Sequence, residues 1–121
     1  MHLSKQLLLC FFLFTTTHLL AQEPTGWTKL KSPTNETLRR LFFVDENNGW
    51  AVSLGGKIIN TTDSGNNWNI QNSTVAAPIV DIFFINANRG WAITYPSEPP
   101  FGTSILTTSN GGDNWVKDSV F

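Results

Sequence analysis

The chain has little cysteine and little histidine: Cys10, His2 and His18 all lie within its first 18 residues. The rest of the chain therefore has no disulfide, and histidine-based metal or catalytic sites are excluded from it. Packing must stabilise it, because no covalent link does. Charged residues make up only 14% of the chain, and the net charge is −1. We see no concentrated basic patch, so we expect no nucleic-acid partner.

The N-terminal segment predicts a secretory signal peptide. Lys5 gives it a positive start, residues 7–14 form an apolar run, and Ala21 offers a small residue for cleavage. The run is too short to cross a membrane comfortably, although an uncleaved anchor is the alternative. We expect residues 1–21 to be removed. The mature chain would then have no membrane span and would be secreted, periplasmic or at the cell surface.

Two sequence blocks recur along the chain. The pattern T-x-[D/N]-x-G-x-x-W comprises Thr61, Asp63, Gly65 and Trp68 in one copy, and Thr108, Asn110, Gly112 and Trp115 in the other. The earlier block of each pair contains Phe43, Gly49 and Trp50, and then Phe84, Gly90 and Trp91. Trp50 and Trp91 are 41 positions apart, whereas Trp68 and Trp115 are 47 apart. The second unit therefore carries six additional residues.

A period in the low forties, with four short strand-like runs per unit, is typical of a β-propeller blade. We predict an all-β fold of two four-stranded antiparallel blades. Residues 22–121 form a partial propeller, with units at about 27–67 and 68–114 and a third unit starting at 115. Two units cannot close a ring, which takes about 4–8 blades. We therefore expect a fragment of a larger ring, or several copies that assemble.

Strands are expected at 27–30, 38–44, 50–53, 58–61, 68–71, 79–85 and 115–118. The runs at 38–44 and 79–85 are almost continuously apolar, which indicates strands covered on both faces. Residues 45–49 and 86–90 read as hairpin turns in which the glycine supplies a positive φ. Residues 95–102 form a swollen turn whose three prolines keep it out of the sheet. Such an insertion commonly faces a partner.

The repeated T-x-[D/N]-x-G-x-x-W stretch reads as a structural turn. Asp63 can accept hydrogen bonds from main-chain N–H groups, and Gly65 can adopt a positive φ. Trp68 would pack its indole on the hairpin and bury about 150–250 Å². Asn110 stands where Asp63 does in the other copy, so the position needs an oxygen and not a charge. A catalytic carboxylate would not tolerate that exchange.

These residues resemble the Asp-box (bacterial neuraminidase) repeat. Together with the preceding F-x-[D/N]-x-x-x-G-W-A-[V/I] block, they are most similar to the photosystem II stability and assembly factor family and its relatives. The resemblance covers Trp27 to Trp115 and implies a seven-bladed, non-catalytic propeller that binds proteins. It implies no cofactor. The expected partners are a protein or further propeller blades, and the uncovered blade faces predict self-association.

The enzymatic alternative is a sialidase or glycosidase fragment. A sialidase needs an arginine triad and a tyrosine nucleophile with a glutamate partner. The three available arginines include the neighbours Arg39 and Arg40, and Tyr95 is the single tyrosine. No spacing selects a pair of catalytic carboxylates, and too few carboxylates converge for calcium. We therefore predict no catalytic, metal or cofactor residues; a cell-surface adhesion protein is the other non-enzymatic alternative.

Overall fold

The computed structural model describes residues 26–96, 99 and 101–119. These residues contain eight β-strands and no helix. None of these residues therefore belongs to a helix that could cross a membrane. The expected signal peptide lies outside the described residues. The strands are β1 (Leu38–Phe43), β2 (Gly49–Ser53), β3 (Ile58–Thr61), β4 (Asn69–Gln71), β5 (Ile79–Phe84), β6 (Gly90–Thr94), β7 (Ser104–Thr108) and β8 (Val116–Ser119).

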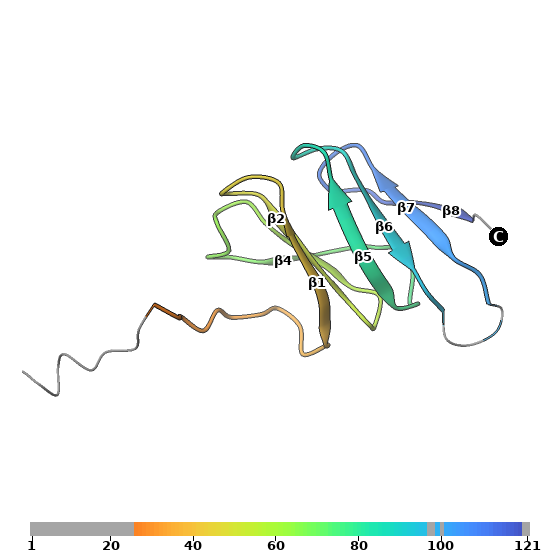
Figure 1. Cartoon of the computed structure of the whole chain (residues 1–121), viewed down its shortest axis with the longest axis horizontal. Coiled ribbons are helices and arrows are strands. Elements are labelled where there is room, and N and C mark those ends of the chain that lie inside the picture. The colour runs from red at the N-terminus through yellow and green to blue at the C-terminus, as the bar shows by residue number, and fades with distance from the viewer. Residues whose placement is uncertain (1–25, 97–98, 100, 120–121) are drawn as a thin grey trace, which may run out of the picture.

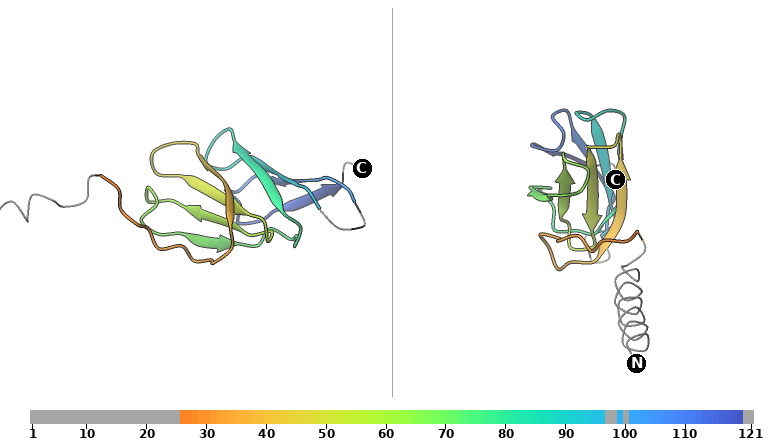
Figure 2. Two further views of the ribbon diagram at one scale, coloured as in Figure 1. Left: turned by 60° about the horizontal axis from the view of Figure 1, so that its bottom comes forward. Right: turned by 90° about the vertical axis from the view of Figure 1, so that its left-hand side faces the viewer.

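The strands form two four-stranded antiparallel sheets, in the orders β1-β2-β3-β4 and β5-β6-β7-β8. The predicted all-β architecture of two such sheets is confirmed. We call the first sheet blade 1 and the second sheet blade 2. The first two strands of each blade pair in the same register: Phe42 opposes Trp50 in blade 1, and Phe83 opposes Trp91 in blade 2. Figure 1 shows β1 and β5 side by side at the junction of the blades, and Figure 2 shows the two sheets from other directions.

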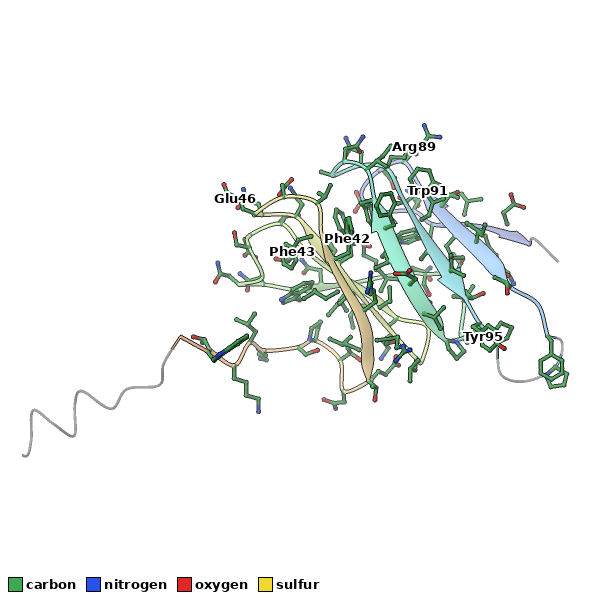
Figure 3. All side chains as sticks on the ribbon, viewed as in Figure 1. Phe42, Phe43, Glu46, Arg89, Trp91 and Tyr95 are labelled. Carbon is green, nitrogen blue, oxygen red and sulfur yellow. The ribbon has the colours of Figure 1, made fainter. Side chains whose placement is uncertain are left out.

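The core lies between the two blades. Blade 1 contributes Trp50, Val52 and Ile58 to it, and blade 2 contributes Ile79, Ile82, Phe84, Ala92, Leu106 and Trp115. Side chains alternate between the faces of a strand, so one face of each sheet packs into this core and the other points outward. In Figure 3, Phe42 lies on the β5 side of β1, whereas Phe43 points to the opposite side.

The predicted strand at 27–30 is wrong. These residues belong to no strand, and the Trp27 side chain is 91% exposed. A strand needs a partner strand to accept and donate its backbone hydrogen bonds, and within the described residues this segment pairs with none.

The prediction that β1 is covered on both faces is also wrong. Leu38, Leu41 and Phe43 are exposed, because blade 2 covers only one face of blade 1. In β5, buried Ile82 and Phe84 alternate with exposed Phe83. Both inner strands are apolar on two faces, and this structure covers one face of each.

Gly49 and Gly90 end the predicted hairpin turns, but for a different reason from the expected one. Neither has a positive φ, and each is the first residue of a strand. A Cβ on Gly49 would lie 2.6 Å from the ring of Phe43, and one on Gly90 would lie 2.5 Å from the ring of Phe84. Glycine is therefore required here because a phenyl ring packs directly against the backbone.

Candidate functional site

The first repeated turn, residues 61–68, joins β3 to β4 and is held by the side chains of Thr61 and Asp63. The buried Thr61 hydroxyl accepts the N–H of Gly65 at 2.9 Å and donates to Asp63 Oδ1 at 2.8 Å. Asp63 also accepts the N–H of Asn67 at 2.8 Å and its side-chain amide at 2.7 Å. Gly65 has a φ of +88°. Each residue of the motif thus has a role within the turn.

The second turn, residues 108–115, repeats this geometry without a carboxylate. Thr108 accepts the N–H of Gly112 at 2.9 Å and donates to Asn110 Oδ1 at 3.0 Å. Asn110 accepts the N–H of Asn114 at 3.0 Å. Gly112 has a φ of +90°. One side-chain oxygen is enough to hold the turn, so the negative charge of Asp63 is not needed for it.

The two motif tryptophans differ in burial. Trp115 is buried in the core, where its ring meets Phe84 edge to face with centroids 5.9 Å apart. Trp68 is half-buried on the outward face of blade 1, edge to face with Phe43 at 6.0 Å. Its indole N–H donates to the Gly65 carbonyl at 2.9 Å. Trp68 therefore packs on its own hairpin as expected, yet among the described residues no further blade covers it as blade 1 covers Trp115.

Two residues outside the predicted set, Gln71 and Gly111, join the blades together with Trp50 and Trp115. The indole N–H of Trp50 crosses to the carbonyl of Gly111 at 3.0 Å, and the side-chain amide of Gln71 donates to the same carbonyl at 2.8 Å. Gln71 also accepts a hydrogen bond from the indole of Trp115 at 3.4 Å. Gly111 has a φ of +70°, and Ser64, at the same motif position, has a φ of +63°. The repeat spacing could have located Ser64 and Gly111, but not Gln71, whose counterpart is Asp118.

The outward face of blade 1 forms a cleft of about 390 Å³ beside the segment 30–32. Its lining is largely apolar and comprises Leu30, Lys31, Ser32, Leu38, Arg39, Arg40, Leu41, Ala51, Ile59 and Trp68. The floor is closed by Ala51 and Ile59, which are buried, whereas Leu41 at the side is exposed. This face can take up apolar side chains.

A second hollow of about 390 Å³ lies beside the insertion between β6 and β7. Tyr95, Pro96, Phe101, Gly102 and Thr103 line it, while residues 97, 98 and 100 of the insertion lie outside the described part of the chain. The side chains of Tyr95 and Phe101 are 65% and 71% exposed. The Tyr95 N–H donates to the Pro78 carbonyl at 2.9 Å, which ties the insertion to the start of β5. Figure 3 shows Tyr95 at the end of β6, away from the hairpin turn that holds Arg89.

Within residues 26–96, 99 and 101–119, no three His, Cys, Asp or Glu side chains come together as a metal site would require. Hydrogen bonds from the Asn67 side chain and backbone and from Thr61 hold the pKa of Asp63 below its ordinary value. Hydrogen bonds from Asn48 and Asn47 do the same to the pKa of Asp45.

Glu36, Ser53 and Lys57 form a polar cluster that is structural. The Ser53 hydroxyl donates to Glu36, whose other oxygen lies 3.1 Å from the Lys57 ammonium. Ser53 is fully buried, so its hydroxyl cannot reach a substrate. The Ser53 and Lys57 hydrogen bonds lower the pKa of Glu36, which favours a fixed anion over a proton donor. The cluster fastens the loop before β1 to the β2–β3 hairpin.

The model of one protein family, described as "Photosynthesis system II assembly factor YCF48", matches residues 20–120. The chain belongs to the YCF48 family. Among solved structures, the chain is similar to "YCF48 bound to D1 peptide", with a TM-score of 0.64 and 24% identity over 78% of this chain. The likeness spans 30% of that solved chain. It identifies the two sheets as β-propeller blades. No curated protein matches the chain.

Proposed function

We propose that this YCF48-family chain is a non-catalytic module of a β-propeller that binds an extended segment of a partner protein. The observation that carries this proposal is the pair of exposed aromatic side chains, Tyr95 and Phe101, on the hollow beside the insertion. Exposed aromatic residues are the commonest anchors of protein interfaces. Insertions in repeat folds also often lie on the binding face.

The comparison with solved structures supports a peptide as the ligand class. The similar structure is of a YCF48 with a D1 peptide bound. An extended peptide suits a hollow of about 390 Å³ with two aromatic walls, because one or two side chains would fill it.

The charged groups support a non-catalytic role. A general acid needs a raised pKa, whereas the pKa values of Glu36, Asp45 and Asp63 are lowered by hydrogen bonds. Arg40 pairs with Asp81 and Arg89 lies over the ring of Trp91, so these arginines do not join in one carboxylate-binding cluster. A sialidase-type site has no basis in these residues.

Two finer assignments belong to the same proposal. The turns at 61–68 and 108–115 have the residue pattern and hydrogen bonding that suit Asp-box repeats. We also propose that the chain is exported after cleavage behind Ala21. Mass spectrometry of the chain recovered from outside the cytoplasm of a bacterial host would test this. A chain lighter by residues 1–21 supports export, and a full-length chain found only in the cytoplasm contradicts it.

Peptide binding can be tested by fluorescence anisotropy with a labelled D1 peptide and a panel of unrelated extended peptides. Replacing both Tyr95 and Phe101 by Ala should weaken binding of any peptide that binds by about tenfold or more. The control is Leu54→Ala, which changes an exposed apolar residue in the shorter, equivalent turn of blade 1. Binding that the double variant leaves unchanged would contradict the proposed site. Release of dye from a fluorogenic sialoside would instead favour the enzymatic alternative.

A further inference from the structure

The interface between the two blades is built from repeat positions that recur on the outward faces. Trp50, Val52 and Ile58 of blade 1 project into the core and are fully buried. Their equivalents in blade 2 are Trp91, Ile93 and Ile105, on the sheet face that points away from blade 1. Phe83 stacks on Trp91 at this face and also meets Phe42 of blade 1 edge to face, with ring centroids 5.3 Å apart. Ile93 and Phe83 are 40% and 53% exposed. We call this outward surface of blade 2 the donor face.

The residues that receive Trp50 also recur. In blade 2, Ile82, Phe84, Ala92 and Leu106 lie against blade 1 and are buried. Their equivalents in blade 1 are Leu41, Phe43, Ala51 and Ile59, on the outward face that forms the apolar cleft. Every position keeps its apolar character. We call this outward surface of blade 1 the acceptor face.

The stacking contact can be repeated between these faces. Trp50 stacks on Phe84 with the ring centroids 3.5 Å apart and the planes 9° from parallel. The equivalent pair is Trp91 with Phe43, and Phe43 is 38% exposed on the acceptor face. Figure 3 shows Phe43 on one outward side of the molecule and Trp91 towards the other, so the two cannot meet within one chain.

The acceptor face also offers the hydrogen-bond acceptor that the indole needs. The Trp50 N–H donates to the carbonyl of Gly111, and the equivalent carbonyl on blade 1 belongs to Ser64. Ser64 has a φ of +63°, close to the +70° of Gly111, although a residue with a Cβ rarely adopts such a φ. The Ser64 turn of blade 1 therefore has the same backbone conformation that lets the Gly111 carbonyl accept a hydrogen bond from an indole N–H.

Charge favours the same pairing. Arg40 and Asp81 occupy equivalent positions on β1 and β5 and form an ion pair of 3.1 Å between the blades. Both side chains are more than half exposed. If a second chain docked its acceptor face on the donor face, Asp81 of the first chain would face Arg40 of the second. Opposite charges would therefore meet at this interface as they do at the internal one.

We propose that the donor face of one chain binds the acceptor face of a second copy, with Trp91 stacked on Phe43, so that copies associate head to tail. Such a heterologous contact closes a ring when the rotation per blade allows it. Asp118 lacks the donor that Gln71 supplies internally, so the contact is weaker than the internal one and depends on concentration. This assembly is independent of peptide binding at the insertion.

The test is sedimentation velocity of the full-length chain over a range of concentrations. The unmodified chain should associate reversibly, and Trp91→Asp and Phe43→Asp should each weaken association by about tenfold or more. Trp27→Ala is the control, since it removes an equally large exposed tryptophan outside both faces. Circular dichroism checks that the variants fold. Val116→Asp is a second donor-face variant, because exposed Val116 lines one hollow with Trp91.

Mixing the two variants decides the orientation. The Phe43→Asp chain keeps its donor face and the Trp91→Asp chain keeps its acceptor face, so an equimolar mixture should form a one-to-one dimer through one intact contact. A dimer of either variant alone that is as tight as the dimer in the mixture would show contact between like faces and overturn the proposal. A wild-type chain that stays monomeric at every concentration would overturn it as well. Neither result would bear on binding at Tyr95 and Phe101, which anisotropy measures separately.

Discussion

Trp50 lies flat on Phe84, with ring centroids 3.5 Å apart, while its indole N–H donates to the carbonyl of Gly111. This one side chain therefore supplies both an aromatic stack and a hydrogen bond between the two blades. Truncating it to Ala should cost about 3–5 kcal/mol of unfolding free energy, as for other large buried residues. Trp50→Phe keeps a ring on Phe84 and should cost less, since Gln71 still donates to Gly111.

Urea denaturation of the two Trp50 variants measures these costs. Trp91→Ala is the matched control, because it is the repeat equivalent on an outward face, and at low protein concentration it should change stability little. Equal losses for Trp50→Ala and Trp91→Ala would show that burial by blade 2 is not what stabilises the Trp50 contact.

Adding a methyl group at the two strand-start glycines should affect the blades unequally. Gly90→Ala places a Cβ against the ring of Phe84, which is buried beneath Trp50 and cannot move, so we expect a loss of about 1–3 kcal/mol. Gly49→Ala meets the ring of Phe43, which is partly exposed and can turn aside at lower cost. Thermal denaturation of both variants would test whether Gly90→Ala loses more stability than Gly49→Ala. A larger loss for Gly49→Ala would contradict it.

The hydroxyl of Thr61 should matter more to the first turn than the charge of Asp63. Thr61→Val leaves the buried N–H of Gly65 without its acceptor, which should cost about 1–3 kcal/mol. Asp63→Asn should be mild, because Asn110 makes the equivalent bonds in the second turn. Thr62→Val, at the exposed neighbouring position, is the control for loss of a hydroxyl. Chemical denaturation in which Asp63→Asn lost as much as Thr61→Val would restore a special role for the carboxylate.

Acid should weaken blade 1 through its turn carboxylates. The pKa values of Asp45 and Asp63 are lowered on folding, chiefly by hydrogen bonds from Asn48 and Asn67. Their stabilisation is therefore complete above the ordinary aspartate pKa of about 4 and is lost as the pH falls from there through the lowered values. Blade 2 has Asn86 and Asn110 at these positions, so its turns have no carboxylate whose protonation would weaken them in acid.

The Asp45→Asn, Asp63→Asn double variant should therefore flatten the fall in the denaturation midpoint below about pH 4. Glu36, whose pKa is also lowered, keeps its own contribution in the variant. Denaturation curves at neutral pH and at acidic steps would measure the difference. An unchanged slope in the double variant would exclude these two carboxylates as the source.

The repeat spacing predicted the two sheets well, because turn residues and apolar runs are local signals. The β3 strand, Ile58–Thr61, matches its expected range, and Gly65 and Gly112 adopt the positive φ that the motif requires. What lies beside a strand is not a local signal. The sequence near Trp27 reads like the start of β4, yet a strand forms only where a neighbour is present.

The same limit explains the other differences. Leu41 and Phe43 are apolar in the manner of a doubly covered strand, and only the structure shows that one side is open. The roles of Gly49 and Gly90 depend on where the rings of Phe43 and Phe84 lie, which spacing does not reveal. Gln71 donates a hydrogen bond to Gly111 across the blade junction, and its counterpart Asp118 has no side-chain amide to do the same, so no repeat pattern could have identified it.

The hydrogen bond from Trp50 to Gly111 joins positions 61 residues apart. The strands within each sheet are, by contrast, paired in chain order, and so each can form by closing short loops, at the microsecond pace of hairpins. Docking of one sheet on the other must wait until the turn at 108–115 has formed, since that turn supplies the acceptor. Refolding should thus show a fast phase, in which each sheet forms, and a slower phase, in which the two sheets dock. Trp50→Ala should slow the second phase, and Trp91→Ala should leave its rate unchanged.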